Sequence, residues 1–71
     1  MIRLTTPTSS GYITEYVAAA NVARITEADA ASQWHGIRSI VRLLDGGVIE
    51  CNETADSIRK MVEAAPQEQT K

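Results

Sequence analysis

The sequence predicts a small α+β domain: a mostly antiparallel sheet of four to five strands followed by one C-terminal helix. Two observations carry most of this prediction. Residues 37–51 are two aliphatic segments separated by Asp45-Gly46-Gly47, a strong hairpin signal. Residues 54–65 have the apolar spacing of a helix with one buried face. With 71 residues, the chain is expected to form one domain over 1–66, with 67–71 as a frayed polar tail.

The C-terminal helix has a start signal, a buried face and a stop signal. Thr54 is a suitable N-cap, and Asp56 in the first turn complements the helix dipole. Asp56 and Lys60 are spaced as a favourable i,i+4 pair on the exposed side. Pro66 disfavours helical backbone at the residue before it and so ends the helix. The predicted buried positions follow i, i+3, i+4, i+7 spacing and are Ile58, Met61, Val62 and Ala65.

The hairpin over 37–51 has two possible loops. A two-residue loop at Asp45-Gly46 would mix apolar and charged residues on each face of the hairpin. A three-residue loop ending in a left-handed Gly47 pairs Val41 with Cys51, and it pairs Arg42 with Glu50 on the other face. We prefer the longer loop because it separates apolar from charged residues and places opposite charges across the strands.

The N-terminal region predicts two short strands. Residues 2–5 alternate between apolar and polar side chains and are rich in strand-forming residues. Pro7 is expected to end that strand. Residues 7–11, Pro-Thr-Ser-Ser-Gly, have the composition of a loop. Residues 12–17 contain Tyr, Ile, Thr and Val, which favour a second strand.

Residues 15–31 allow two interpretations, because seven of these seventeen residues are alanine. One is a helix over roughly 14–30, followed by the C-terminal hairpin and helix; its apolar stripe would then include Arg24 and Glu27. The other is a strand over 12–17, an alanine turn over 18–21, a strand over 22–28 and a loop over 29–36. Alanine propensity is a weak guide that packing overrides, so the two interpretations remain open on composition alone.

A family resemblance favours the strand interpretation. The segments "MIRLT", "YVAAANVARITEA" and "IVRLLDGGVIECNETADSIRKMV" resemble the pattern of small bacterial FlbD/SwrD-type flagellar-associated proteins. In that pattern Val22–Ile25 matches an Ile-x-x-Ile segment, Val41–Gly46 matches a strand ending in Asn/Asp-Gly, and Glu53-Thr54 matches a Glu-Ser before the helix. The end of LytTR-type DNA-binding domains is similar in outline. The resemblance implies strands over 12–28 and a small bacterial or phage-type protein.

Composition narrows the classes of function and partner. The chain has 7 basic and 9 acidic residues and a net charge of −2, which argues against a general nucleic-acid or membrane binder, although a local basic stripe remains possible. No signal-like or membrane-spanning apolar run is present, so we expect a cytoplasmic protein with Cys51 reduced.

Of the usual ways to stabilise a small domain, only association with another chain remains. One cysteine cannot form an intrachain disulfide, and one cysteine with one histidine cannot make a usual zinc site. No metal or cofactor is therefore expected. Small domains bury a limited core, so we expect a homo-oligomer, most simply a dimer.

The candidate contact surface consists of Trp34, His35, Arg38 and Arg42. Trp34 could anchor a partner or stack on a base; alternatively it covers one edge of the core, with His35 in a loop. Arg38 and Arg42 lie on one face of a strand, and Arg24 could lie near them. They could contact phosphates, or they could belong to a solvated sheet face with cross-strand ion pairs.

No catalytic residues are predicted. Cys51 points inward beside Ile49 in the preferred register, as a small buried apolar residue would, and the lone His35 has no nucleophile beside it in the sequence. The sequence thus predicts a non-enzymatic interaction module that associates with itself. The alternative is a nucleic-acid-binding regulator that uses the arginine-bearing sheet face and Trp34.

Overall fold

The computed structural model describes residues 1–33 and 35–65, and these form five strands and three helical segments. The strands are β1 (Ile2–Thr8), β2 (Gly11–Val17), β3 (Val22–Glu27), β4 (Ser39–Leu43) and β5 (Val48–Cys51). The helical segments are η1 (Ala19–Asn21), α1 (Ala30–Gln33) and α2 (Ala55–Ala64). The predicted α+β class is confirmed. The predicted tail over 67–71 lies outside the described residues.

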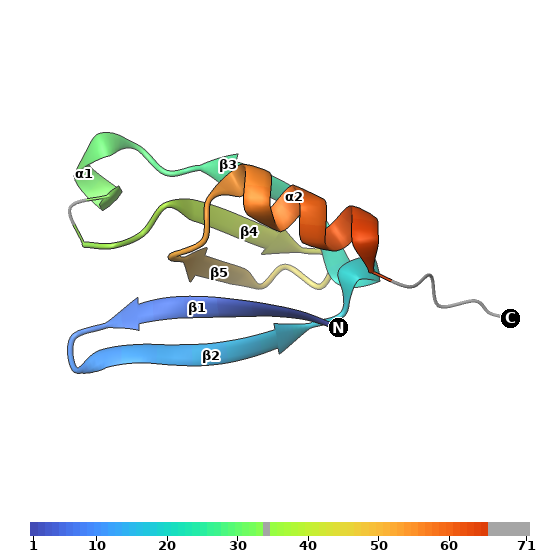
Figure 1. Cartoon of the computed structure of the whole chain (residues 1–71), viewed down its shortest axis with the longest axis horizontal. Coiled ribbons are helices and arrows are strands. Elements are labelled where there is room, and N and C mark those ends of the chain that lie inside the picture. Colours follow the sequence, from blue (N-terminus) through green and yellow to red (C-terminus); the bar gives the residue numbers. More distant parts are fainter. Residues whose placement is uncertain (34, 66–71) are drawn as a thin grey trace, which may run out of the picture.

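The strands form two antiparallel sheets rather than one. β1 pairs with β2, and β3, β4 and β5 pair in that order. Figure 1 shows β1 running beside β5 in the same direction, with α2 lying over the three-stranded sheet. The hairpin of β1 and β2 therefore extends the three-stranded sheet on its β5 side, and β2 lies farthest from α2.

The strand interpretation of the alanine-rich stretch is confirmed. The predicted turn over 18–21 is a 3₁₀ turn in which the Asn21 N–H donates to the Ala18 carbonyl at 2.9 Å. The Asn21 carbonyl in turn accepts from the Leu44 N–H at 2.9 Å. Because this turn is fixed against the end of β4, the alanines close a tight connection and do not propagate a helix.

Two predictions about loops are wrong in detail. The predicted loop over 29–36 contains the short helix α1, because the Asp29 carboxylate accepts from the Ser32 N–H at 2.9 Å and caps its start. β1 also continues through Pro7 to Thr8, and only Ser9 and Ser10 form the turn. Pro7 is tolerated because it lies opposite Tyr12 at a position where the strand pair needs no N–H from it.

The hairpin of β4 and β5 has the predicted faces but a different register. Val41 lies opposite Ile49, not Cys51, and Arg42 lies opposite Val48, not Glu50. The turn is shifted one residue toward the N-terminus, and Gly46, with φ of 95°, takes the left-handed position expected of Gly47. A shift of the turn by one residue moves the cross-strand partner of every residue by two positions. Because side chains alternate between the two faces with a period of two, every side chain keeps its predicted face.

The core lies between the sheets and one face of α2. Ile58 is fully buried, and its neighbours on the same helix face, Met61, Val62 and Ala65, are partly buried against the core. Thr54 caps the helix by accepting from the Ser57 N–H at 3.1 Å, and Asp56 pairs with Lys60 at 3.3 Å, as predicted. The buried apolar residues that meet there are Ile2, Leu4, Val17, Val41, Ile49, Cys51 and Ile58.

The Asn52-Glu53 turn joins the two sheets. The Asn52 N–H donates to the Thr5 carbonyl at 2.7 Å, and the Glu53 carboxylate accepts from the Thr5 N–H at 2.9 Å. The same turn is fixed to the rest of the domain, because the Asn52 amide donates to the Gly36 carbonyl and the Ser39 hydroxyl donates to the Glu53 carbonyl, each at 2.7 Å. Both polar groups of the Thr5 backbone thus point away from β2.

Glu53→Ala should lower the free energy of unfolding by about 1–3 kcal/mol, because it leaves the partly buried Thr5 N–H without its acceptor. Glu53→Gln retains an oxygen that can accept the same hydrogen bond and should lose less than half as much. Urea unfolding of both variants measures the difference. Equal losses in the two variants would show that the side-chain hydrogen bond does not hold the sheets together.

Candidate interaction surface

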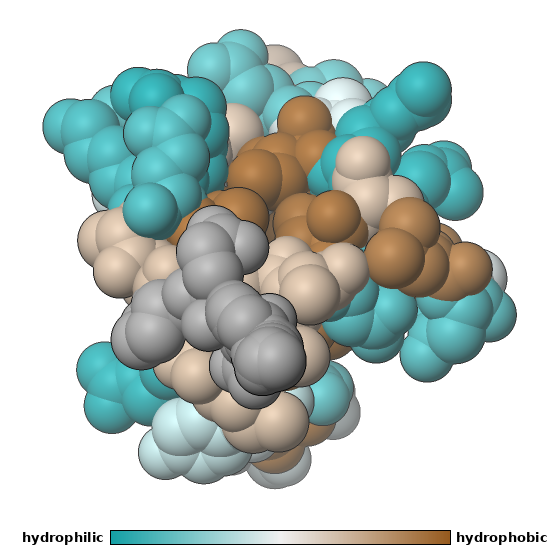
Figure 2. All heavy atoms as spheres, turned by 90° about the vertical axis from the view of Figure 1, so that its right-hand side faces the viewer, coloured by the Kyte–Doolittle hydropathy of each residue, from teal (hydrophilic) through white to brown (hydrophobic). Residues whose placement is uncertain are grey.

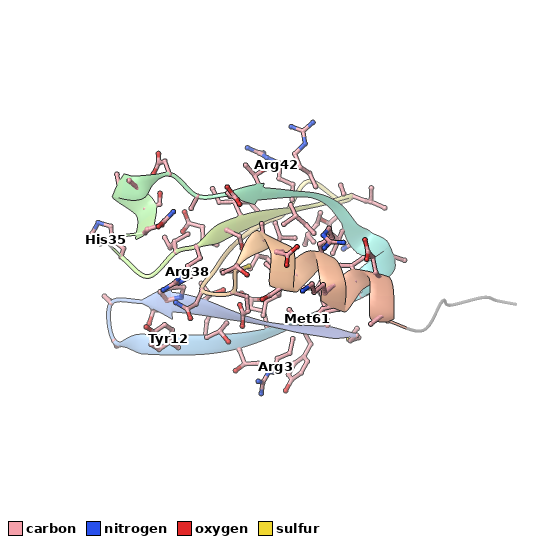
Figure 3. All side chains as sticks on the ribbon, turned by 45° about the horizontal axis from the view of Figure 1, so that its top comes forward. Arg3, Tyr12, His35, Arg38, Arg42 and Met61 are labelled. Atoms are coloured by element: carbon pink, nitrogen blue, oxygen red, sulfur yellow. The ribbon has the colours of Figure 1, made fainter. Side chains whose placement is uncertain are left out.

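The structure places the described members of the predicted contact surface at separate positions. His35 is exposed and borders a pocket at the tip of the β1–β2 hairpin, with Pro7 and Ser9. Arg38 precedes β4 and borders another pocket with Thr54 at the start of α2. In Figure 3, Arg42 extends above β3 and β4, whereas Arg38 lies below them. Trp34 lies outside the described residues.

Arg42 has an arginine, not a carboxylate, as its cross-strand neighbour. It lies directly opposite Arg24 of β3, and both residues are exposed. Glu50 lies opposite Ile40 instead. The ion pairs found among residues 1–33 and 35–65 all lie along α2, so the expected pairing of Arg42 with Glu50 is not formed. Two like charges face each other across this pair of strands, which is unfavourable unless an anion lies nearby.

Cys51 is fully buried. Burial raises the pKa of the Cys51 thiol to about 11, and the negative charge of Glu53 adds to the shift. The sulfur lies 3.5 Å from the Ile49 carbonyl within the core. A protonated and inaccessible thiol is unsuited to nucleophilic chemistry, and the structure thus supports the interpretation of Cys51 as a core residue.

Neither a metal-binding cluster nor a membrane-spanning helix is found among the described residues. No group of three or more His, Cys, Asp or Glu side chains in 1–33 and 35–65 is arranged to hold a metal ion. The helices in the same ranges include none that is long and apolar enough to cross a membrane.

The β1–β2 hairpin has an exposed apolar surface that the sequence analysis did not identify. Tyr12 and Tyr16 are 64% and 65% exposed, and Ile13 is 48% exposed. Tyr12 and Tyr16 share a face of β2 with Thr14 because alternate residues of a strand point the same way. The alternation Tyr-x-Thr-x-Tyr could have indicated such a face, but it does not reveal which side of the strand lacks a partner.

The outer edge of β2 presents unpaired backbone groups. Thr5 lies opposite Thr14, and both backbone polar groups of Thr5 bond to the Asn52-Glu53 turn. Thr5 and Thr14 are therefore a non-hydrogen-bonded pair, and antiparallel geometry directs the N–H and C=O of Thr14 outward, together with those of Tyr12 and Tyr16. No strand of the described chain pairs with this edge of β2.

A second apolar region lies where the N-terminus meets the end of α2. Met1, 79% exposed, borders a shallow pocket of about 250 Å³ with Ile2 and Met61. Figure 2 shows hydrophobic side chains gathered at this end of the molecule. The pocket is shallow and open to solvent, so it is not the enclosed kind of cavity that binds small molecules.

No protein-family model, curated protein or solved structure matches this chain.

The raised thiol pKa predicts a loss of stability at alkaline pH. Below pH 9.0, the ordinary pKa of the thiol, Cys51 is protonated in both states and the full stability is present. Above it the unfolded chain ionises first, so the free energy of unfolding should fall by at most about 2–3 kcal/mol as the pH rises toward 11. Urea unfolding between these pH values measures the effect.

Cys51→Ala is the control, because it lacks the titrating thiol while other groups titrate as before. The difference in stability between the two proteins should narrow as the pH rises. A difference that stays constant over this range would contradict the raised pKa.

Proposed function

We propose that this chain is a non-enzymatic, cytoplasmic interaction module that associates with itself, most simply as a dimer. The observation that carries the proposal is the incomplete β1–β2 hairpin. The hairpin is attached to the three-stranded sheet through β1 only. β2 leaves its outer edge unpaired and exposes Tyr12 and Tyr16 on one face and Ile13 on the other. A partner that completes this hairpin would cover both the backbone groups and the apolar side chains.

The opposite edge of the fold is protected, which supports a specific role for β2. β3 contains a bulge between Val22 and Arg24, and it packs under α2. It also carries the exposed charges of Arg24 and Glu27. Bulges, charges and covering helices are the means by which proteins protect edge strands from pairing. β2 has only one charged residue, Glu15.

The resemblance to FlbD/SwrD-type proteins agrees with a small bacterial or phage-type interaction protein, and we propose that class without assigning a flagellar role. The matched Glu53 holds the junction between the sheets. A structural role for this residue would give such a family a reason to have a carboxylate before the helix.

Light scattering coupled to gel filtration tests self-association. The protein should have twice the mass of one chain, and Tyr12→Ser/Tyr16→Ser should raise the dimer dissociation constant at least about tenfold, because aromatic side chains dominate interface energies. Leu44→Ser is the matched control, since Leu44 is 69% exposed but lies in the β4–β5 turn. The mass of a single chain at every concentration up to the solubility limit would refute the proposal.

A second candidate function, nucleic-acid binding, is favoured by one observation. Arg24 and Arg42 face each other on the exposed side of the sheet, and the carboxylates described in 1–33 and 35–65 form no ion pair with either. Two adjacent guanidinium groups suit a phosphate. The acidic net charge of −2 opposes this function, and it therefore ranks second.

Gel-shift assays at low salt test the second candidate. If it is right, single-stranded or duplex nucleic acid should bind weakly, and added salt should abolish the complex. Arg24→Glu/Arg42→Glu should eliminate binding, while Arg38→Glu, which alters an arginine at a separate pocket, should have a smaller effect. No complex with the unmodified protein at low salt would exclude this function.

A further inference from the structure

The free edge of β2 has the symmetry needed to pair with itself. Its outward backbone groups belong to Tyr12, Thr14 and Tyr16, because the pairing of Thr5 with the Asn52-Glu53 turn fixes which residues of β2 point inward to β1. Three outward residues with Thr14 in the middle form a pattern that a second antiparallel copy can match residue for residue.

We infer that two copies of this chain pair β2 with β2 in antiparallel orientation, with the two-fold axis at Thr14. This inference rests on the proposed self-association and specifies its surface. Tyr12 of each copy then lies opposite Tyr16 of the other, and the two Thr14 residues face each other. Each outward residue donates one N–H and accepts at one C=O, so the contact forms about six backbone hydrogen bonds.

The charge of Glu15 and the length of the overlap select this register. Only residues whose backbone N–H and C=O point outward can exchange hydrogen bonds with the second copy. The register between the two strands can therefore change only by two residues at a time. A shift toward the C-terminus of β2 places Glu15 directly opposite Glu15 of the second copy, and like charges in that position repel. A shift toward the N-terminus leaves Tyr16 without a partner. Only the axis at Thr14 uses all three outward residues and separates the two carboxylates.

The side chains favour the same register. Tyr12 and Tyr16 of opposite copies form two cross-strand aromatic pairs on the outer face, and such pairs stabilise antiparallel strands. On the other face Ile13 lies opposite Glu15 of the second copy. Ile13 is 48% exposed, and the aliphatic stem of Glu15 can cover it.

The body of the domain leaves this edge accessible. α2 packs against β3 and η1, and Figure 1 shows it over β3 and β4, separated from β2 by β1. The outward residues of β2 include no proline or charged residue of the kind that blocks edge pairing. A second copy can therefore approach along the full length of the strand.

Thr14→Pro tests the inference, because proline removes the outward N–H at the axis without removing a hydrogen bond between β2 and β1. The substitution should raise the dimer dissociation constant at least about tenfold, since two bonds are lost per dimer, while the circular dichroism spectrum stays unchanged. Glu27→Pro is the matched control. The Ala28 N–H bonds to the Arg38 carbonyl of the neighbouring segment, so antiparallel alternation points the backbone N–H of Glu27 away from β4. Glu27→Pro thus removes an outward N–H from β3, the edge strand on the opposite side of the fold.

Glu15→Gln tests the register separately. With the axis at Thr14 it should change the dissociation constant by no more than about threefold, whereas with Glu15 residues face to face it should tighten the dimer well beyond that, by relieving repulsion. Strong tightening would overturn the proposed axis.

Amide hydrogen exchange of the unmodified protein settles the case in which a proline variant fails to fold. The amides of Tyr12, Thr14 and Tyr16 should become protected as the dimer forms. A dimer in which these amides exchange freely, or which survives Thr14→Pro unchanged, would overturn strand pairing while leaving self-association intact. A protein that remains a single chain at all concentrations would overturn both.

Discussion

The backbone of Thr5 is bonded to the Asn52-Glu53 turn, and the rest of the structure depends on that junction. One main-chain bond of 2.7 Å and one carboxylate bond of 2.9 Å attach the hairpin of β1 and β2 to the three-stranded sheet. The same turn fixes the segment before β4 through Gly36 and β4 itself through Ser39, and it leads directly into Thr54, the cap of α2. A short polar turn thus aligns the elements that enclose the apolar core.

The features that the sequence predicts well are those set by neighbouring residues. The cap at Thr54 involves a partner three residues away, and the buried face of α2 follows from spacing alone. The faces of β4 and β5 follow from alternation, which is insensitive to the shift of the turn from Gly47 to Gly46. The helix α1 had a local signal too, in Asp29 preceding Ser32 by three residues, and this pattern indicates a helix start.

The features that escaped prediction depend on contacts distant in sequence. Which residues of β2 direct their backbone groups outward depends on Thr5, whose partner Glu53 lies 48 positions later. The arginine at position 42 meets Arg24 because β3 pairs with β4, and no local pattern specifies that neighbour. Residues 34–42 contain tryptophan, histidine and arginine, residue types that often mark a contact surface. The surface on β2 consists of common strand residues, and only their place at an unpaired edge makes them distinctive.

The order in which the chain emerges during synthesis gives the junction a further consequence. The β1–β2 hairpin is local in sequence and can form early, but it can dock only after Asn52 and Glu53 have been made, 47 to 48 residues beyond Thr5. Contacts with such long sequence separation form late in folding. Until then Ile2 and Leu4, which are buried in the finished domain, remain uncovered on a two-stranded ribbon. Two chains whose hairpins have not yet docked would therefore expose apolar strands to each other, and association at this stage is a route to aggregation.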